Sequence, residues 1–425
     1  MRRGTERAWL IVFLATAALD LVPVAAARPL PAGLRLHGAI GIGADTNALT
    51  FDRGMATSTY MPYELWAAYE VRPASRTELR LQANAGGHAY SGVAPGGRDQ
   101  DYGASLRLVQ RLWGERRSRS SSPGLDLVIQ PYWRAGRSVY TSHQLYREVV
   151  RLERRHDGEP PRRVSLGGRY NAAEVGTELG LEWRGSRGSR WELEYEAVAR
   201  NYENDYRWVG VVVGGSVVNP VQRDDYAAWA VRIGTQQPLG RGLTVRARYW
   251  HDRTQWVDRA SRYVDGFLVL DPSVFESQRF DTDVLRTELR WEPSRQLECS
   301  VAPAWSWRKD HAWGYWDSAL WSIDTGIRYR WRRHLEVAAE YHYAHRDYST
   351  ARENFSAPVF GKPLLDDYPR AVSLEAGWRV APHGSMVARY VYDNRNANAI
   401  RDDSGSTPIF PYERSRADVR YEFRY

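Results

Sequence analysis

The last eleven residues, Ser415 to Tyr425, read SRADVRYEFRY and show the pattern that identifies the fold class. Apolar or aromatic side chains alternate there with charged ones: Ala417, Val419, Tyr421, Phe423 and Tyr425 against Arg416, Asp418, Arg420, Glu422 and Arg424. Successive side chains of a β-strand point to opposite faces, so this segment has one apolar face and one ionic face. About ten such residues, tilted near 45°, cross a bilayer. The segment therefore predicts a strand that separates lipid from water.

A less strict form of this alternation between apolar and polar residues recurs along the chain in segments of about 8 to 12 residues, which is the pattern of a transmembrane barrel. The predicted strands are Leu34 to Ala44, Tyr60 to Arg72, Thr77 to Gly87, Tyr102 to Trp113, Leu125 to Ala135, Ala173 to Arg184, Trp191 to Asn201, Ala227 to Gln237, Leu243 to Arg253, Val284 to Glu292, Leu297 to Trp307, Trp321 to Arg332, Leu335 to His345, Val372 to Val380, Met386 to Asp393 and Tyr412 to Tyr425. We therefore expect an all-β fold, a transmembrane antiparallel up-and-down β-barrel of about 16 strands.

The connections between these segments alternate in length. Even-numbered strands are followed by tight turns such as Pro73 to Arg76 and Pro238 to Gly242, and odd-numbered strands by long polar loops such as Thr254 to Asp283 and Arg346 to Ala371. Short periplasmic turns and long extracellular loops are typical of outer-membrane barrels. Two connections depart from this alternation, the long Gly114 to Gly124 and the short Arg308 to Ser318.

The N-terminus has the three parts of a secretory signal: basic residues up to Arg7, an apolar run to about Val22, and small residues ending at Ala27. We expect residues 1–27 to be a signal peptide and residues 28–425 to form a single barrel domain. Beyond the signal no run of about 18 apolar residues follows, which argues against a helical membrane protein. A barrel needs no such run, because half of each strand faces a polar lumen.

Residue composition limits the classes of cofactor and partner to be expected. The single cysteine, Cys299, excludes an intrachain disulfide framework, and no Cys/His spacing is that of a zinc or haem site. We therefore expect no metal and no cofactor. The net charge of +8 does not indicate nucleic acid, because basic residues alternate with acidic ones instead of clustering.

Aromatic residues make up 12% of the chain and gather at strand ends, for example Trp113, Trp183, Trp191 and Trp291. Tyrosine and tryptophan favour the boundary between lipid and water, so the pattern indicates two aromatic girdles. A soluble β-sandwich is the alternative, but its inner face would be apolar and not studded with arginine and glutamate.

The face opposite the apolar one supplies the candidate pore lining. An acidic sector consists of Glu178, Glu182, Glu192, Glu194 and Glu196, and a basic sector beside it of Arg232, Arg246 and Arg248. Further round the barrel follow Arg286, Glu288, Arg328, Glu340 and Glu375. Two interpretations stay open: opposite charges pair across the ladder and keep the wall hydrated, or the sectors create a transverse field that sets ion preference.

The loop Tyr202 to Asp225 is apolar and β-branched around Gly214-Gly215. It predicts a hairpin that extends the flanking strands above the membrane. Folding inward as a constriction is the alternative.

Catalytic motifs are missing from the sequence. It contains no Gly-x-Ser-x-Gly elbow and no His-Glu-x-x-His, and His342 and His345 are three residues apart, on opposite faces of one predicted strand. We therefore do not expect an enzyme.

The aromatic C-terminus resembles the assembly signal of bacterial outer-membrane β-barrel proteins, carried here by Tyr421, Phe423 and Tyr425. The chain also resembles the beta-barrel porin families in Gly41 to Asn47, Tyr390 to Asn396 and Tyr412 to Arg414. The resemblance implies the outer membrane of a Gram-negative bacterium, contact with outer-membrane lipid and lipopolysaccharide, and the barrel assembly machinery as partner.

The family likeness further implies a porin-like channel for passive diffusion of small hydrophilic solutes. The alternative is the barrel component of an exopolysaccharide secretion system, whose cargo would be an anionic polymer. Similar export barrels usually carry a periplasmic helical-repeat domain, whereas about six residues separate the predicted signal from the first strand here. We therefore expect an export role to need separate periplasmic partners.

Overall fold

The structure is a computed structural model that describes residues 32–46, 58–91, 98–114, 123–138, 172–202, 206–207, 211–213, 216–218, 221–222, 225–256, 263–264, 267–268, 279–311, 317–331, 334–347, 366–397 and 412–425. The predicted signal peptide lies outside these residues, as does most of the connection Gly114 to Gly124.

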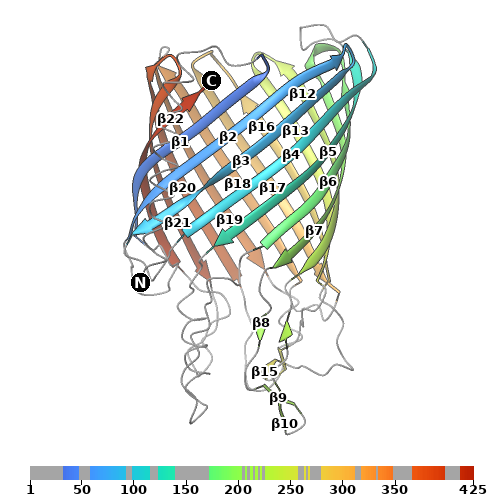
Figure 1. Cartoon of the computed structure of the whole chain (residues 1–425), viewed down its shortest axis with the longest axis vertical. Coiled ribbons are helices and arrows are strands. Elements are labelled where there is room, and N and C mark those ends of the chain that lie inside the picture. The colour runs from blue at the N-terminus through green and yellow to red at the C-terminus, as the bar shows by residue number, and fades with distance from the viewer. Residues whose placement is uncertain are drawn as a thin grey trace.

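Sixteen antiparallel strands close into one barrel (Figure 1). They are β1 (Leu34–Asp45), β2 (Ser58–Ala74), β3 (Thr77–Ser91), β4 (Arg98–Trp113), β5 (Gly124–Ser138), β6 (Ala172–Arg184), β7 (Arg190–Tyr202), β12 (Tyr226–Gly240), β13 (Leu243–Trp256), β16 (Arg279–Trp291), β17 (Leu297–Asp310), β18 (Ser318–Trp331), β19 (Leu335–Asp347), β20 (Asp366–Ala381), β21 (Gly384–Ala397) and β22 (Tyr412–Arg424). Each pairs with its neighbours in sequence order, and β22 pairs with β1. The predicted up-and-down barrel is confirmed, and each predicted strand has its counterpart.

Short elements complete the described secondary structure. They are the 3-10 helix η2 (Ser186–Gly188) and the strands β8 (Tyr206–Arg207), β9 (Val211–Val213), β10 (Ser216–Val218), β11 (Val221–Gln222), β14 (Tyr263–Val264) and β15 (Phe267–Leu268). β9 pairs with β10, and β8 pairs with β11. Figure 1 shows β8, β9 and β10 beyond the end of the barrel, as the hairpin interpretation of this loop requires. In the described residues no helix has the length and apolar character needed to cross a membrane.

Several strands are longer than predicted at the long-loop end of the barrel. β16 begins at Arg279 where Val284 was predicted, and β20 begins at Asp366 where Val372 was predicted. Beyond the apolar layer both faces of a strand meet water, so the alternation that marks a strand disappears. The loops predicted as Thr254 to Asp283 and Arg346 to Ala371 therefore included residues that belong to strands.

The opposite end has tight turns. β12 and β13 are joined by a two-residue turn, in which Gly240 pairs with Leu243 and the central residues Arg241 and Gly242 have φ of 51° and 75°. Positive φ at both central positions is the geometry that matches the twist of a hairpin, and glycine adopts it without steric cost. We call this end of the barrel the short-turn end.

The outer face is apolar, with aromatic residues at its margins. On β6 the exposed side chains are Val175, Leu179, Leu181 and Trp183, at every second or fourth position. Exposed tryptophans lie beside the short turns: Trp113, Trp183, Trp191, Trp291, Trp331 and Trp378. A second group lies further towards the long loops: Trp133, Tyr249, Trp305, Trp307 and Trp321. This distribution agrees with the predicted aromatic girdles.

The seam between β1 and β22 closes the barrel. Near the short-turn end, Leu36 and Tyr425 exchange both backbone hydrogen bonds, with N···O distances of 2.9 and 2.8 Å, and near the other end the Thr46 amide donates to the Ser415 carbonyl at 2.9 Å. On the inner face the Arg414 guanidinium donates to the carboxylate of Asp45, whose exposed fraction is 0%. The seam therefore combines a continuous backbone ladder with a buried ion pair.

Inner side chains also reach across a whole strand where that strand has a glycine. The Tyr132 hydroxyl on β5 donates to Glu196 on β7 at 2.5 Å, passing over Gly176 on β6. Tyr60 on β2 reaches Asp418 on β22 at 3.1 Å in the same way, over Gly43. A Cβ atom at either glycine would overlap the tyrosine ring. Glycine is therefore required at both positions by close approach and not by its backbone angles.

We predict that Gly176→Ala lowers the free energy of unfolding by about 1 to 3 kcal/mol, the usual cost of overpacking. Gly180→Ala is the matched control, because it is on the same strand and face and its Cβ would meet its nearest atom, the Val128 Cβ, at an ordinary 3.5 Å. Urea unfolding in lipid vesicles, followed by tryptophan fluorescence, measures both variants. Equal stability of the two variants would contradict the steric account.

Candidate pore-lining site

The acidic sector lies on the inner faces of two neighbouring strands. β6 carries Glu178 and Glu182, and β7 carries Glu192, Glu194 and Glu196. The register places Glu178 directly opposite Glu196, and Glu182 directly opposite Glu192. Like charges opposite one another destabilise a sheet, so this arrangement needs positive partners from other strands.

Arginines of the basic sector supply part of that charge. Arg232 on β12 contacts the carboxylate of Glu196 and lies 3.9 Å from that of Glu194. Arg248 on β13 reaches over Gly234 of β12, and its Nε donates to Glu192 at 2.9 Å. The two predicted sectors are thus brought together as ion pairs, as the pairing interpretation requires.

Glu182 is held by arginines that the sequence analysis did not place in the pore. Its carboxylate lies 3.0 Å from both Arg107 and Arg190, and 3.7 Å from Arg184. Arg107 comes from β4 and reaches across β5. Its sequence signal is its position between Leu106 and Leu108 in the alternating segment of β4.

The other predicted lining residues are distributed round the barrel and do not form one cluster. The Arg246 Nε donates to Gln236 at 2.7 Å, and a guanidinium nitrogen lies 3.8 Å from Glu288. Arg286 pairs with Asp324 at 2.7 Å and Arg328 with Glu336 at 3.4 Å. Among the described residues, Glu340 and Glu375 have no ion pair or hydrogen bond of their side chains.

The sequence analysis did not predict a polar cluster on the outer face. We call Tyr249, His251, Arg253, Asp281, Asp283 and His311 the outer rim cluster. Arg253 donates to Asp281 twice, at 2.6 and 2.8 Å, and a ring nitrogen of His311 lies 2.7 Å from the same carboxylate. Asp283 accepts from the Tyr249 hydroxyl at 2.6 Å and lies 2.9 Å from the His251 Nδ1. It escaped prediction because Asp283 was assigned to a loop.

His342 and His345 do not share one site. His342 lies 2.5 Å from Asp324, whereas His345 stacks on Tyr368 with ring centroids 4.7 Å apart and contacts Trp321. These partners are on opposite faces, as predicted from the spacing of three. In the described part of the chain no group of three or more His, Cys, Asp or Glu side chains is arranged to hold a metal ion.

A closed sixteen-strand antiparallel barrel with an apolar, aromatic-edged outer face and a charged inner face defines a class of protein. Such a wall satisfies every backbone group internally and presents apolar side chains to lipid. The chain is a β-barrel protein of the Gram-negative outer membrane.

Comparison with known proteins does not assign the chain to a family. No protein-family model matches the chain, and no curated protein matches it. Among solved structures it is similar to the copper transporter OprC (10% identity, 94% of this chain and 82% of that chain, TM-score 0.43). It is also similar to OpdK of Pseudomonas aeruginosa with vanillate (10% identity, 92% of this chain and 99% of that chain, TM-score 0.42). A third similar structure is OmpF of Salmonella typhi with daunomycin (10% identity, 92% of this chain and 97% of that chain, TM-score 0.43).

The pairing of Arg232 with Glu196 leads to a prediction about ion preference. Arg232→Gln removes the guanidinium group that pairs with Glu196, so the reversal potential of a planar bilayer under a salt gradient should shift towards cation preference. The double variant Arg232→Gln/Glu196→Gln removes both charges of the pair and should return the reversal potential close to that of the original protein. An unchanged reversal potential in the single variant would exclude a role of this pair in selectivity.

Proposed function

We propose that this protein is a porin-like channel through which small hydrophilic solutes diffuse passively. One observation carries the proposal: a closed wall of sixteen strands whose inner face is lined by ionisable side chains. A barrel of this size is too wide for its own side chains to fill and encloses an aqueous passage. Charged groups are stable there because water and opposite charges solvate them.

The pattern of ion pairs supports weak selectivity. Glu182, Glu192 and Glu196 each have an arginine within ion-pair distance, so much of the charge of the acidic sector is neutralised locally. A pore wall whose charges are paired presents only small electrostatic barriers to ions of either sign. The channel should therefore pass uncharged and singly charged solutes at comparable rates.

Two contacts with the membrane and its machinery belong to the same proposal. The outer rim cluster includes the exposed Tyr249 and lies beside the exposed Trp307, at the long-loop end where lipopolysaccharide headgroups would meet the barrel. Tyr421, Phe423 and Tyr425 are on the apolar face of the last strand, and the Tyr425 ring stacks on His383 with centroids 4.8 Å apart. We propose that the outer rim cluster contacts lipopolysaccharide and that the barrel assembly machinery recognises the three C-terminal aromatic residues.

Osmotic swelling of proteoliposomes tests the channel directly. With uncharged sugars of increasing size, we expect swelling well above that of empty liposomes for monosaccharides and a steep fall for larger oligosaccharides, because the rate falls as the solute approaches the width of the lumen. Liposomes with the heat-unfolded protein are the control. Swelling equal to this control for every sugar would refute passive diffusion and favour a partner-dependent exporter.

A further inference from the structure

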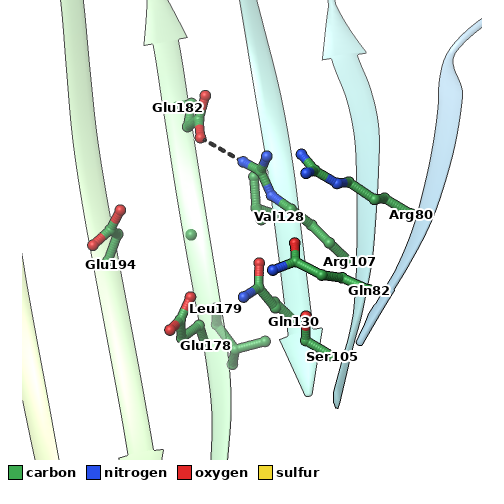
Figure 2. Close-up of a pocket in the computed structure, with 11 residues that line it drawn as sticks. Arg80, Gln82, Ser105, Arg107, Val128, Gln130, Glu178, Leu179, Glu182 and Glu194 are labelled. Atoms are coloured by element: carbon green, nitrogen blue, oxygen red, sulfur yellow. Dashed lines mark hydrogen bonds and ion pairs between the residues drawn. The ribbon is translucent and has the colours of Figure 1, made fainter. Parts of the chain in front are cut away.

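A hollow of about 190 Å³ in the inner wall lies next to the acidic sector (Figure 2). Its lining comes from β3, β4, β5, β6 and β7 and includes Arg80, Arg107, Glu178, Glu182 and Glu194. At about 30 Å³ for each water molecule of the liquid, it has room for about six waters. A solute of the size of an amino acid or a dipeptide fits this volume.

One side of the hollow has an excess of positive charge. The register places Arg80 directly opposite Arg107, which puts two guanidinium groups side by side. Arg107 is 3.0 Å from Glu182, whereas Arg80 has no ion pair within the described residues and lies over the Trp66 ring at 5.3 Å. Figure 2 shows both arginines directed to the same part of the hollow. At this side of the hollow only one of the two guanidinium groups, that of Arg107, has a carboxylate within ion-pair distance among the described residues.

The opposite side has an excess of negative charge. Glu178 faces Glu196 across the β6·β7 pair, and Arg232 contacts Glu196 but makes no ion pair with Glu178. Among the described residues Glu178 has no ion pair, and Glu194 has only Arg232 at 3.9 Å. The hollow thus has two poles, and the arginines come from strands two or more places away from the glutamates, at about 4.8 Å for each strand spacing.

We propose that this hollow binds small zwitterions of amino-acid or dipeptide size on their way through the channel. The solute carboxylate would be held by Arg80 and Arg107, because guanidinium groups bind carboxylates in a planar, two-bond geometry. The solute ammonium group would be held by Glu178 and Glu194. Gln130 is on β5, between the strands that carry the two poles, and Gln82 and Ser105 also line the hollow; these side chains can donate to or accept from a peptide group. One molecule that carries both charges neutralises both poles, which an ion of one sign does not.

This inference names a solute class for the proposed channel and rests on that function, but its test needs no conductance. The probes form a size-matched set: glycylglycine is the zwitterion, acetylglycine the anion, glycylglycinamide the cation and acetylglycinamide the uncharged compound. Saturation-transfer NMR on the detergent-solubilised barrel measures their binding. We expect glycylglycine to bind at least about tenfold more tightly than each of the other three, a factor equivalent to about 1.4 kcal/mol.

Matched variants test the two poles separately. Glu178→Gln/Glu194→Gln should weaken glycylglycine binding at least about tenfold, as the loss of one charge-assisted contact predicts. Its control is Glu340→Gln/Glu375→Gln, which removes two carboxylates from β19 and β20 and should leave glycylglycine binding unchanged. Arg80→Gln should weaken binding likewise, with Arg389→Gln on β21 as its control. Equal effects of test and control variants would overturn the site, as would equal binding of all four probes. Either result leaves the channel proposal standing, since that depends on swelling and conductance.

Discussion

The fold depends on one constraint, that backbone amides and carbonyls inside a lipid layer must bond to one another because lipid offers no partner. The ladder between β1 and β22 meets this constraint at the only place where the sheet could otherwise have two edges. Its bonds extend from Leu36 with Tyr425 to Thr46 with Ser415, and the buried pair of Asp45 and Arg414 lies on its inner side. Once this seam is closed, one face of every strand must be apolar and the other is free to be polar.

Charged side chains on the inner face are neutralised partly by contacts that reach across a whole strand. Like charges stand opposite one another at Glu178 with Glu196 and at Glu182 with Glu192, so the directly opposite residues cannot neutralise them. Some partners come from the adjacent strand, as Arg232 on β12 contacts Glu196 and Arg190 on β7 lies 3.0 Å from Glu182. Others come from the next strand but one, as Tyr132 reaches Glu196 and Arg248 reaches Glu192. Small residues on the crossed strand make these contacts possible. The same geometry leaves Arg80 and Glu178 without close partners within the described residues, and these two charges define the poles of the wall hollow.

Much of the fold and part of the site follow from sequence alone. A period of two residues, sustained over sixteen segments, specifies both the strands and the face of each side chain, so the alternation by itself assigns the lining glutamates and arginines to the inner face. Ion-pair partners could not be assigned, because they depend on register between strands far apart in sequence, as for Arg107 with Glu182. The outer rim cluster escaped for a different reason: outward residues such as Arg253 and Asp281 are polar where the wall leaves the apolar layer, and there the alternation no longer distinguishes strand from loop.

We expect the closed wall to surround an open aqueous passage. Single-channel recording of the folded barrel in a planar bilayer, with the detergent alone as blank, measures whether ions pass. Stable current steps proportional to voltage, with a small reversal potential across a salt gradient, are the predicted result. A correctly folded barrel that inserts into the bilayer and carries no current would contradict the account.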